Sequence, residues 1–254
     1  MAVALVTGAS GGLGRTIALA LAGHGYDVAI HYRGDDLGAA QTADAIHALG
    51  RHTQLVHADF DVRGPTALDA LAGGLVDDVE DTLGPVRALV LNAHPQTLTP
   101  WRDLDTAAWD AMIAGGLRPS AALLRAASER MRVRGTSGVI VTIGSVEGLR
   151  AARGHTAYAV AKAALHHLTA AAASELGELG IRVVGVAPGL IAREGLDQNW
   201  PEGLARWRAA TPLRRPVTAQ EVAATVAFLA SDAASGITGV TIPVDAGWSA
   251  APGW

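Results

Sequence analysis

Residues 2–14 read AVALVTGASGGLG, a short apolar run that ends in a glycine-rich turn. Apolar residues at helical spacing follow at once over 17–21. Gly8, Gly12 and Gly14 let the chain turn tightly, bring backbone N–H groups up to a pyrophosphate and pack a helix closely on a strand. A glycine-rich turn between a first strand and a first helix predicts a dinucleotide-binding βαβ unit.

The alternation of strand and helix patterns continues through all 254 residues. Short β-branched apolar runs predict strands at 2–7, 26–32, 52–58, 87–92, 138–144, 181–187 and 239–244. Ala- and Leu-rich segments of helical period predict helices at 12–24, 36–49, 64–83, 104–134, 155–178 and 218–231. We therefore expect an α/β fold, a doubly wound Rossmann domain with a seven-stranded parallel sheet and helices on both faces. Such a sheet binds ligands beyond the carboxyl ends of its strands.

The chain shows no sign of a second domain. No internal repeat, low-complexity segment or polar linker divides residues 1–254, so we expect a single domain. The longest connection is 190–216, which contains Pro201, Pro212 and Pro216. We predict that this connection forms a lid over the substrate.

The composition excludes several classes of function. A net charge of −4 without a basic stripe argues against nucleic acid as a partner. The absence of cysteine excludes disulfides and thiolate catalysis, and no His, Asp and Glu cluster has metal-ligand spacing. No apolar stretch approaches the ~20 residues of a membrane span, and no basic leader precedes the first strand. We expect a soluble, cytoplasmic protein that binds neither metal nor membrane.

The end of the second predicted strand indicates which dinucleotide is bound. A fold that prefers NAD usually presents an Asp or Glu there, whereas this chain has Tyr32 followed by Arg33. Arg33 can pair with a 2′-phosphate, which favours NADP(H). Asp35 and Asp36 keep NAD open as an alternative, but they follow Gly34, where capping of the next helix is the more ordinary role.

Three residues form a candidate catalytic group. Tyr158 and Lys162 are four residues apart at the start of a predicted helix, so both lie on one face. A phenol with a pKa near ~10 is a weak acid, but an adjacent ammonium and an oxidised nicotinamide would both lower that pKa. Tyr158 can then protonate a carbonyl oxygen, and Ser145, at the end of the preceding strand, can donate a hydrogen bond to the same oxygen.

Taken together, these residues resemble the short-chain dehydrogenase/reductase family, in the branch of 3-oxoacyl-carrier-protein reductases and other ketoreductases. Residues 7–14 match its T-G-x-x-x-G-x-G motif and residues 158–162 its Y-x-x-x-K motif, with Ser145 thirteen residues before the tyrosine. Further matches follow in order: Asp59, Asn92-Ala93, Pro188-Gly189, Ile237-Thr238-Gly239 and Asp245-Ala246-Gly247. The match runs along the whole chain.

The resemblance implies an NADPH-dependent ketoreductase, or an alcohol dehydrogenase working in reverse, which acts on a small-molecule ketone or alcohol as a homo-oligomer (tetramer or dimer). Ser145, Tyr158 and Lys162 would be catalytic. The cofactor would be bound by Gly8, Ser10, Gly12, Leu13, Gly14, Arg33, Asp59, Phe60, Asn92, Ala93, Tyr158, Lys162, Pro188, Gly189 and Ile191. By resemblance, Lys162 holds the nicotinamide ribose and Ile191 meets the carboxamide through its backbone.

Three departures from the family pattern alter these expectations. His94 replaces a glycine beside the cofactor, and Arg193 replaces a threonine that follows the Pro-Gly pair. Gly116, seven residues after Trp109, stands where the family has a fourth catalytic residue, an asparagine. The usual proton relay is therefore incomplete, and the alternative hypothesis is a nucleotide-binding regulator or scaffold with weak catalysis.

Two adjacent glycines, Gly115 and Gly116, interrupt the helical pattern, which predicts a local distortion such as a π-bulge. We expect water or His94 to take up the space of the missing side chain. On this basis Gly116→Asn should change kcat by less than about tenfold.

Other side chains are weaker candidates. His94 and His155 are candidates for proton movement, and Glu147 for binding a substrate hydroxyl or amine. In the predicted lid, Trp200 and Trp207 are candidates to face the substrate. We expect Trp248 and Trp254 to lie at a subunit contact.

Overall fold

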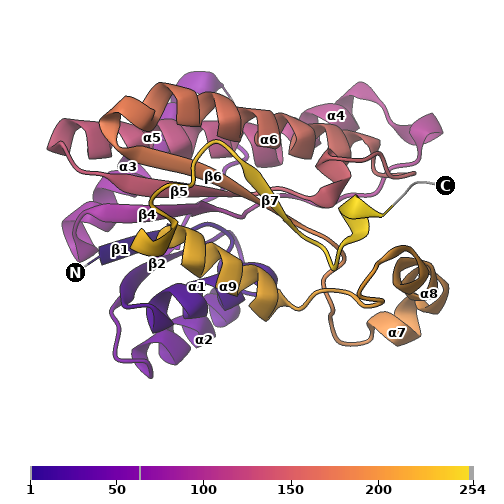
Figure 1. Ribbon diagram of the computed structural model, residues 1–254. Helices are drawn as coiled ribbons and strands as arrows, with labels where there is room; N and C mark the ends of the chain where they lie inside the picture. Colours follow the sequence, from indigo (N-terminus) through magenta and orange to yellow (C-terminus); the bar gives the residue numbers. More distant parts are fainter. Residues whose placement is uncertain (1, 63, 252–254) are drawn as a thin grey trace.

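Seven parallel strands form one sheet in the order β3-β2-β1-β4-β5-β6-β7 (Figure 1). The computed structural model describes residues 2–62 and 64–251. The strands are β1 Ala2–Val6, β2 Tyr26–Tyr32, β3 Thr53–His57, β4 Val86–Leu91, β5 Gly138–Ile143, β6 Ile181–Pro188 and β7 Thr241–Val244. The strand order reverses between β1 and β4, which confirms the doubly wound topology predicted from the sequence.

Helices cover both faces of the sheet. Figure 1 shows α3, α5 and α6 on one side and α1, α2 and α9 on the other. Their bounds are α1 Gly12–Gly23, α2 Asp36–His47, α3 Pro65–Leu83, α5 Arg118–Arg134, α6 Thr156–Leu176 and α9 Ala219–Ala230. In β1, Ala4 and Val6 pack into the core on one face, and Val3 and Leu5 into the core on the other. Because this strand is buried on both faces, its sequence is a continuous apolar run.

The predicted helix 104–134 is the element that differs most from the structure. It is divided into α4 Thr106–Met112, a π-helical turn Ile113–Leu117 and α5, and a short 3-10 turn Trp101–Asp103 precedes it. The π turn contains both adjacent glycines, so the predicted distortion is confirmed. β7 begins two residues later than predicted because Gly239, with φ +74°, turns the chain before the strand.

The segment 190–216 contains two short helices, α7 Leu196–Asn199 and α8 Pro201–Ala210. Trp207 of α8 stacks on Trp248 with ring centroids 5.5 Å apart, and its indole N–H donates to the carbonyl of Arg215. Trp248 therefore packs within its own chain, against the segment that carries Trp207. Trp200 is exposed at 44%, and Trp254 lies outside the described residues.

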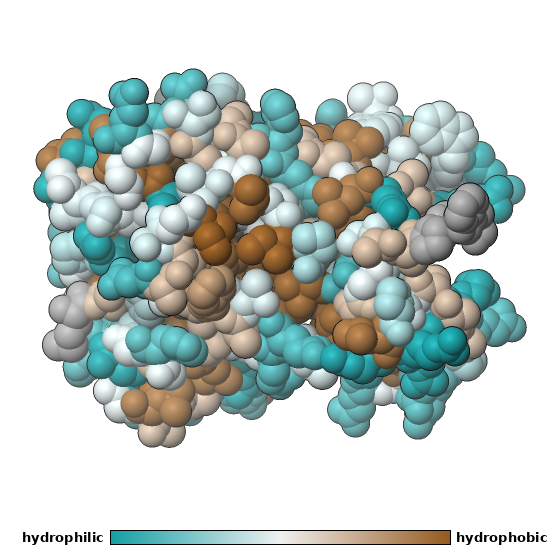
Figure 2. Space-filling view, viewed as in Figure 1, coloured by the Kyte–Doolittle hydropathy of each residue, from teal (hydrophilic) through white to brown (hydrophobic). Residues whose placement is uncertain are grey.

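One face of the molecule carries a hydrophobic patch. Figure 2 shows hydrophobic side chains gathered over β7 and α9. Phe228 of α9 and Val240, the residue before β7, are both exposed. Across residues 2–62 and 64–251, none of the helices combines the length and the apolar character that crossing a bilayer demands.

Candidate active site

The candidate cofactor site begins at the switch point of the sheet, between the carboxyl ends of β1 and β4. The side-chain amide of Asn92 donates to the carbonyls of Thr7 and Gly8, at 2.9 and 3.2 Å. The backbone N–H groups of Asn92 and Ala93 donate to the Thr7 hydroxyl, each at 2.9 Å. These bonds hold the glycine-rich turn and the loop after β4 together as one rigid edge.

The glycines of the turn meet the demands of a phosphate-binding loop. A Cβ at Gly14 would overlap the carbonyl of Gly8, so only glycine lets α1 pack this closely. Gly12 has φ +52° and no atom within 4 Å of the position of a Cβ, which leaves open space beside the helix N-terminus. No side chain caps this end of α1 and its first turn carries no acidic residue, so its N–H groups are free for an anion. Ser10 and Leu13 lie in the same turn. The residues present therefore fit a dinucleotide pyrophosphate.

A buried histidine of β2, His31, contacts this loop, and the sequence did not indicate its role. The N–H of Gly8 donates to Nδ1 of His31 at 3.1 Å, and Nε2 of His31 lies 3.1 Å from the carbonyl of Ala58. Burial lowers the pKa of His31 to about 4. Phe60, predicted to contact the cofactor, stacks on His31 at 4.4 Å and is itself buried, whereas Asp59 is exposed.

Arg33, directly after β2, is the cation that the sequence predicts to pair with a 2′-phosphate. Arg33 is exposed, and its carbonyl accepts from His57 at 2.8 Å. Asp35 caps α2 by accepting from the N–H of Gly38 at 2.9 Å. The predicted capping role is confirmed for Asp35, whereas Asp36 is the first residue of α2.

The candidate catalytic group comes from β5 and α6. Ser145 follows β5 and is buried, Tyr158 lies in the first turn of α6, and Lys162 lies one turn later. The ammonium of Lys162 donates to the carbonyl of Ile143 at 2.7 Å and lies 5.6 Å from the centroid of the Tyr158 ring. The structure thus brings together the three residues predicted from the sequence.

Burial governs the proton affinities of this group. It lowers the pKa of Lys162 to about 7 and raises that of Tyr158 to about 12. The Ser145 hydroxyl offsets part of the rise at Tyr158, and the Glu147 carboxylate adds to it. The sequence-based expectation was that the lysine ammonium lowers the tyrosine pKa. In this structure burial has the largest effect on the Tyr158 pKa and Lys162 is not among the groups that shift it, so Tyr158 is protonated at neutral pH.

His94 fills the space left by Gly116, as one of the two expectations had it. A Cβ at Gly116 would overlap the His94 ring, which packs edge-on against Tyr158 with centroids 5.5 Å apart. Nδ1 of His94 lies 2.7 Å from the carbonyl of Pro95. Nε2 is buried and has no hydrogen-bond partner in the described part of the chain. Burial, and then the charge of Lys162, lower the His94 pKa to about 3, so the imidazole is neutral.

The carbonyl of Gly116 is engaged as well. The Ser120 hydroxyl donates to it at 2.8 Å. In the family that the sequence resembles, the carbonyl at this position binds a water molecule of the proton relay. Here the Ser120 hydroxyl already occupies one of the two lone pairs of this carbonyl.

His166 is a second residue that the sequence analysis missed. Its Nε2 accepts from the backbone N–H of Ser145 at 3.3 Å, and a Cβ at Gly144 would overlap its ring. Burial and the charge of Lys162 lower its pKa to about 4. His166 follows Lys162 by four residues, and this spacing on one helix face was the available signal.

The other predicted cofactor residues lie at the same edge of the sheet. Pro188 ends β6, and the N–H of Gly189 donates to the carbonyl of Val244 at 2.9 Å. Ile191 pairs with Val217 in an isolated parallel bridge. Arg193 is exposed. The chain after β6 therefore runs from the cofactor edge directly into the segment 190–216.

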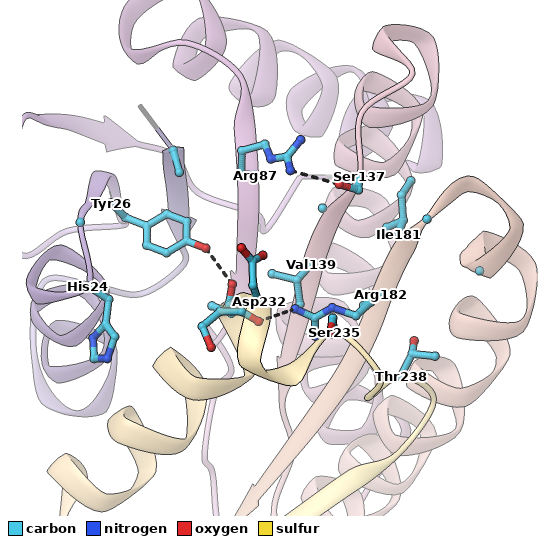
Figure 3. Close-up of a pocket in the computed structure, with 17 residues that line it drawn as sticks. His24, Tyr26, Arg87, Ser137, Val139, Ile181, Arg182, Asp232, Ser235 and Thr238 are labelled. Atoms are coloured by element: carbon cyan, nitrogen blue, oxygen red, sulfur yellow. Dashed lines mark hydrogen bonds between the residues drawn. The ribbon is translucent and has the colours of Figure 1, made fainter.

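A cavity of about 680 Å³ lies at the opposite edge of the sheet, among the amino ends of the strands (Figure 3). Its polar side chains serve the fold. Tyr26 donates to the carbonyl of Ala230 at 2.8 Å, and Arg182 donates to the carbonyls of Ser231 and Ile237, both at 3.3 Å. Because parallel sheets bind ligands at their carboxyl ends, this cavity is not the candidate active site. Within residues 2–62 and 64–251, no three His, Asp or Glu side chains gather as metal ligands would.

Comparisons with known proteins show which proteins the chain is similar to along almost its whole length. The family model described as enoyl-(acyl carrier protein) reductase matches residues 8–249. A short-chain dehydrogenase/reductase of Hericium erinaceus is 34% identical over 249 residues, which cover 96% of each protein. A 3-oxoacyl-[acyl-carrier-protein] reductase of Staphylococcus aureus is 35% identical over 244 residues, again 96% of each. The crystal structure of acetoin dehydrogenase from Enterobacter cloacae matches with a TM-score of 0.88 and 32% identity, over 99% of this chain and 97% of that one.

Proposed function

The chain belongs to the short-chain dehydrogenase/reductase family and is an oxidoreductase of that type, and we propose that it reduces a ketone with NADPH, using Tyr158 as the proton donor. The observation that carries this proposal is the meeting of Ser145, Tyr158 and Lys162 at the carboxyl edge of the sheet, next to a glycine-rich turn that fits a pyrophosphate. A binding protein without catalysis has no chemical need for a tyrosine placed in this way.

The cofactor site is assigned as follows. Bound NADPH would supply the hydride. The N–H groups of residues 10–14 would hold the pyrophosphate, and Arg33 would pair with the 2′-phosphate. Asn92, Ala93 and the segment 188–191 would line the route toward the nicotinamide. Arg33 supports NADP(H) over NAD(H), and one of the two competing carboxylates, Asp35, already caps α2.

Proton transfer rests on the three catalytic candidates. Negative charge develops on the carbonyl oxygen during reduction, and Ser145 is placed to donate a hydrogen bond to it. Tyr158 gives the proton, and its raised pKa keeps it in the protonated form that reduction requires. Lys162 fixes the position of the group through its bond to the Ile143 carbonyl. His94, whose Nε2 has no hydrogen-bond partner among the described residues, occupies the space beside Gly116, where the family has its asparagine.

The relatives differ in substrate, as their names state: one reduces 3-oxoacyl-carrier-protein and another is an acetoin dehydrogenase. For this chain we propose a small-molecule ketone, or the matching alcohol in the reverse direction, with 190–216 as the lid. The hydrophobic surface over β7 and α9 supports a homo-oligomer, since an edge strand can be covered by a second copy.

The deciding experiment is NADPH consumption against a ketone panel that spans hydroxy ketones, 3-oxoacyl thioesters, aromatic polyketides and sugars. Turnover of any of these that disappears in Tyr158→Phe supports the proposal. The competing hypothesis is a nucleotide-binding scaffold. It is supported by one specific observation, that Gly116 stands where the family has a catalytic asparagine. Tight NADPH binding without reduction of any ketone would favour the scaffold.

A further inference from the structure

Glu147 and His155 form a pair beside the candidate acid. Glu147 lies two residues after Ser145, and its backbone N–H donates to the Ser145 hydroxyl at 3.2 Å. His155 is the N-cap residue of α6, three residues before Tyr158. The Glu147 carboxylate lies 2.5 Å from Nδ1 of His155. Both side chains are about one-fifth exposed, at 21% and 22%, so the pair next to Ser145 is partly accessible to a ligand.

The hydrogen bond between them fixes what this pair presents to a ligand. A carboxylate can only accept, so Nδ1 of His155 carries the proton that Glu147 receives. In the neutral imidazole, Nε2 is then left with a free lone pair, and the carboxylate behind the ring strengthens it as an acceptor. Across residues 2–62 and 64–251, Nε2 of His155 makes no hydrogen bond, and it is not fully buried. The pair therefore offers one oriented acceptor, which suits an O–H donor.

The acceptor lies close to the candidate catalytic residues. Ser145 and Tyr158 both aim at the carbonyl oxygen in the proposed reaction, and Glu147 is near enough to Tyr158 for its charge to affect that phenol. His155 stands one helical turn before Tyr158 on the same side of α6. An acceptor at this place would meet a hydroxyl on a carbon close to the carbonyl.

We propose that Glu147 and His155 form a hydroxyl-recognition site, and that the substrates are hydroxy ketones and the corresponding vicinal diols rather than 3-oxoacyl thioesters. This inference rests on the proposed ketone reduction. In that reaction a hydroxy ketone, NADPH and a proton give a diol and NADP⁺, and the recognised hydroxyl is unchanged. Its O–H donates to Nε2 of His155, while Ser145 and Tyr158 serve the carbonyl oxygen.

The test uses three ketones of similar size: hydroxyacetone, methoxyacetone and acetone. Methoxyacetone keeps the second oxygen but cannot donate. We expect kcat/KM of the native enzyme to be at least about tenfold higher for hydroxyacetone than for either of the others, the range of a hydrogen bond to a charge-supported acceptor. In His155→Phe this ratio should fall toward one, mainly through KM. In Glu147→Gln it should fall by less, because the amide oxygen still accepts from Nδ1 of His155 but carries no charge. Glu147→Gln preserves shape, which guards against a result due to misfolding.

Two controls and three contrary outcomes make the test decisive. His167→Phe and Glu175→Gln alter exposed residues of the same helix and should leave the ratio unchanged. Equal kcat/KM for the three ketones in the native enzyme would overturn the proposal. Variants that lower kcat/KM equally for all three ketones would also overturn it, because a pair with a purely structural role would act in this way. Faster turnover of a 3-oxoacyl thioester than of hydroxyacetone would overturn it as well. Reduction of no ketone at all would instead refute the proposed function, and this inference with it.

Discussion

The imidazole of His94 occupies the space that a side chain at Gly116 would need. The family resembled by the sequence has a glycine at the first position and an asparagine at the second, so in this chain the larger side chain stands on the other partner. The exchange keeps a polar group beside Tyr158, since the His94 ring packs edge-on against that phenol at 5.5 Å. It also means that neither position can be understood, or mutated, without the other.

This relationship revises the expected effect of Gly116→Asn. The new Cβ would overlap the His94 ring, whose Nδ1 is bonded to Pro95, so the single variant should lose about 1–3 kcal/mol of stability. We expect its kcat to fall by more than tenfold, not less. His94→Gly combined with Gly116→Asn should recover most of both losses, because the two positions share one space. Urea unfolding and kcat, measured as a double-mutant cycle, would show the coupling.

The matched control for this cycle is Gly74→Asn, because a Cβ at Gly74, also in a helix, would have no atom within 4 Å. It should leave kcat unchanged. Additive effects of the His94 and Gly116 changes would show that the two residues do not compete for space.

Removal of the Tyr158 hydroxyl tests the proton donor. Tyr158→Phe keeps the ring that packs against His94 but has no proton to give, so turnover should fall by about 10²–10⁴-fold. The dissociation constant of NADPH, measured by fluorescence titration, should change little, because the phosphate-binding turn is untouched. A variant that retains near-native turnover would remove Tyr158 from the mechanism.

Arg33 should determine the choice of cofactor. We expect the native enzyme to prefer NADPH over NADH in kcat/KM, and Arg33→Ala to reduce this preference by acting on NADPH alone. The pairing is exposed, so rising salt should weaken it. Arg15→Ala is the control, because the Arg15 side chain bonds to Gln41. Equal kcat/KM for both cofactors in the native enzyme would contradict the assignment.

Much of the fold was predictable because its determinants are local. Strands that are buried on both faces favour continuous apolar runs, and the strand patterns in the sequence place six of the seven strands to within a residue at each end. Gly115 and Gly116 located the π turn, since glycine marks a break in helical propensity. The separate α4 was not predicted, because a helical period looks the same in adjoining α and π turns.

The site was predictable mainly where a contiguous motif carries it, and the contact of His94 with Gly116 is the exception. The glycine-rich turn, Tyr158 and Lys162 have fixed spacings, and the structure places them as expected. His31 and His166 were missed because each acts across elements: His31 reaches from β2 to Gly8, and His166 from α6 to Ser145. Such contacts depend on packing between segments that are distant in the sequence. His166 had one local signal, its spacing of four residues from Lys162, and His31 had none.

The last prediction concerns stability in mild acid. Burial lowers the pKa values of His31, His94 and His166 to about 4, 3 and 4, against about 6.5 for an unfolded histidine. As the pH falls below about 6.5, these histidines become protonated in the unfolded chain but stay neutral in the folded chain. The free energy of unfolding should therefore decrease. With all three titrating, the slope approaches roughly 4 kcal/mol per pH unit between about pH 5.5 and 4.5. Urea unfolding at several pH values would measure it, and His31→Asn should lessen the slope by about a third, whereas His167→Asn, an exposed residue, should not. A free energy of unfolding that stays constant from pH 7 to 5 would show that these imidazoles gain protons in the folded state as readily as in water.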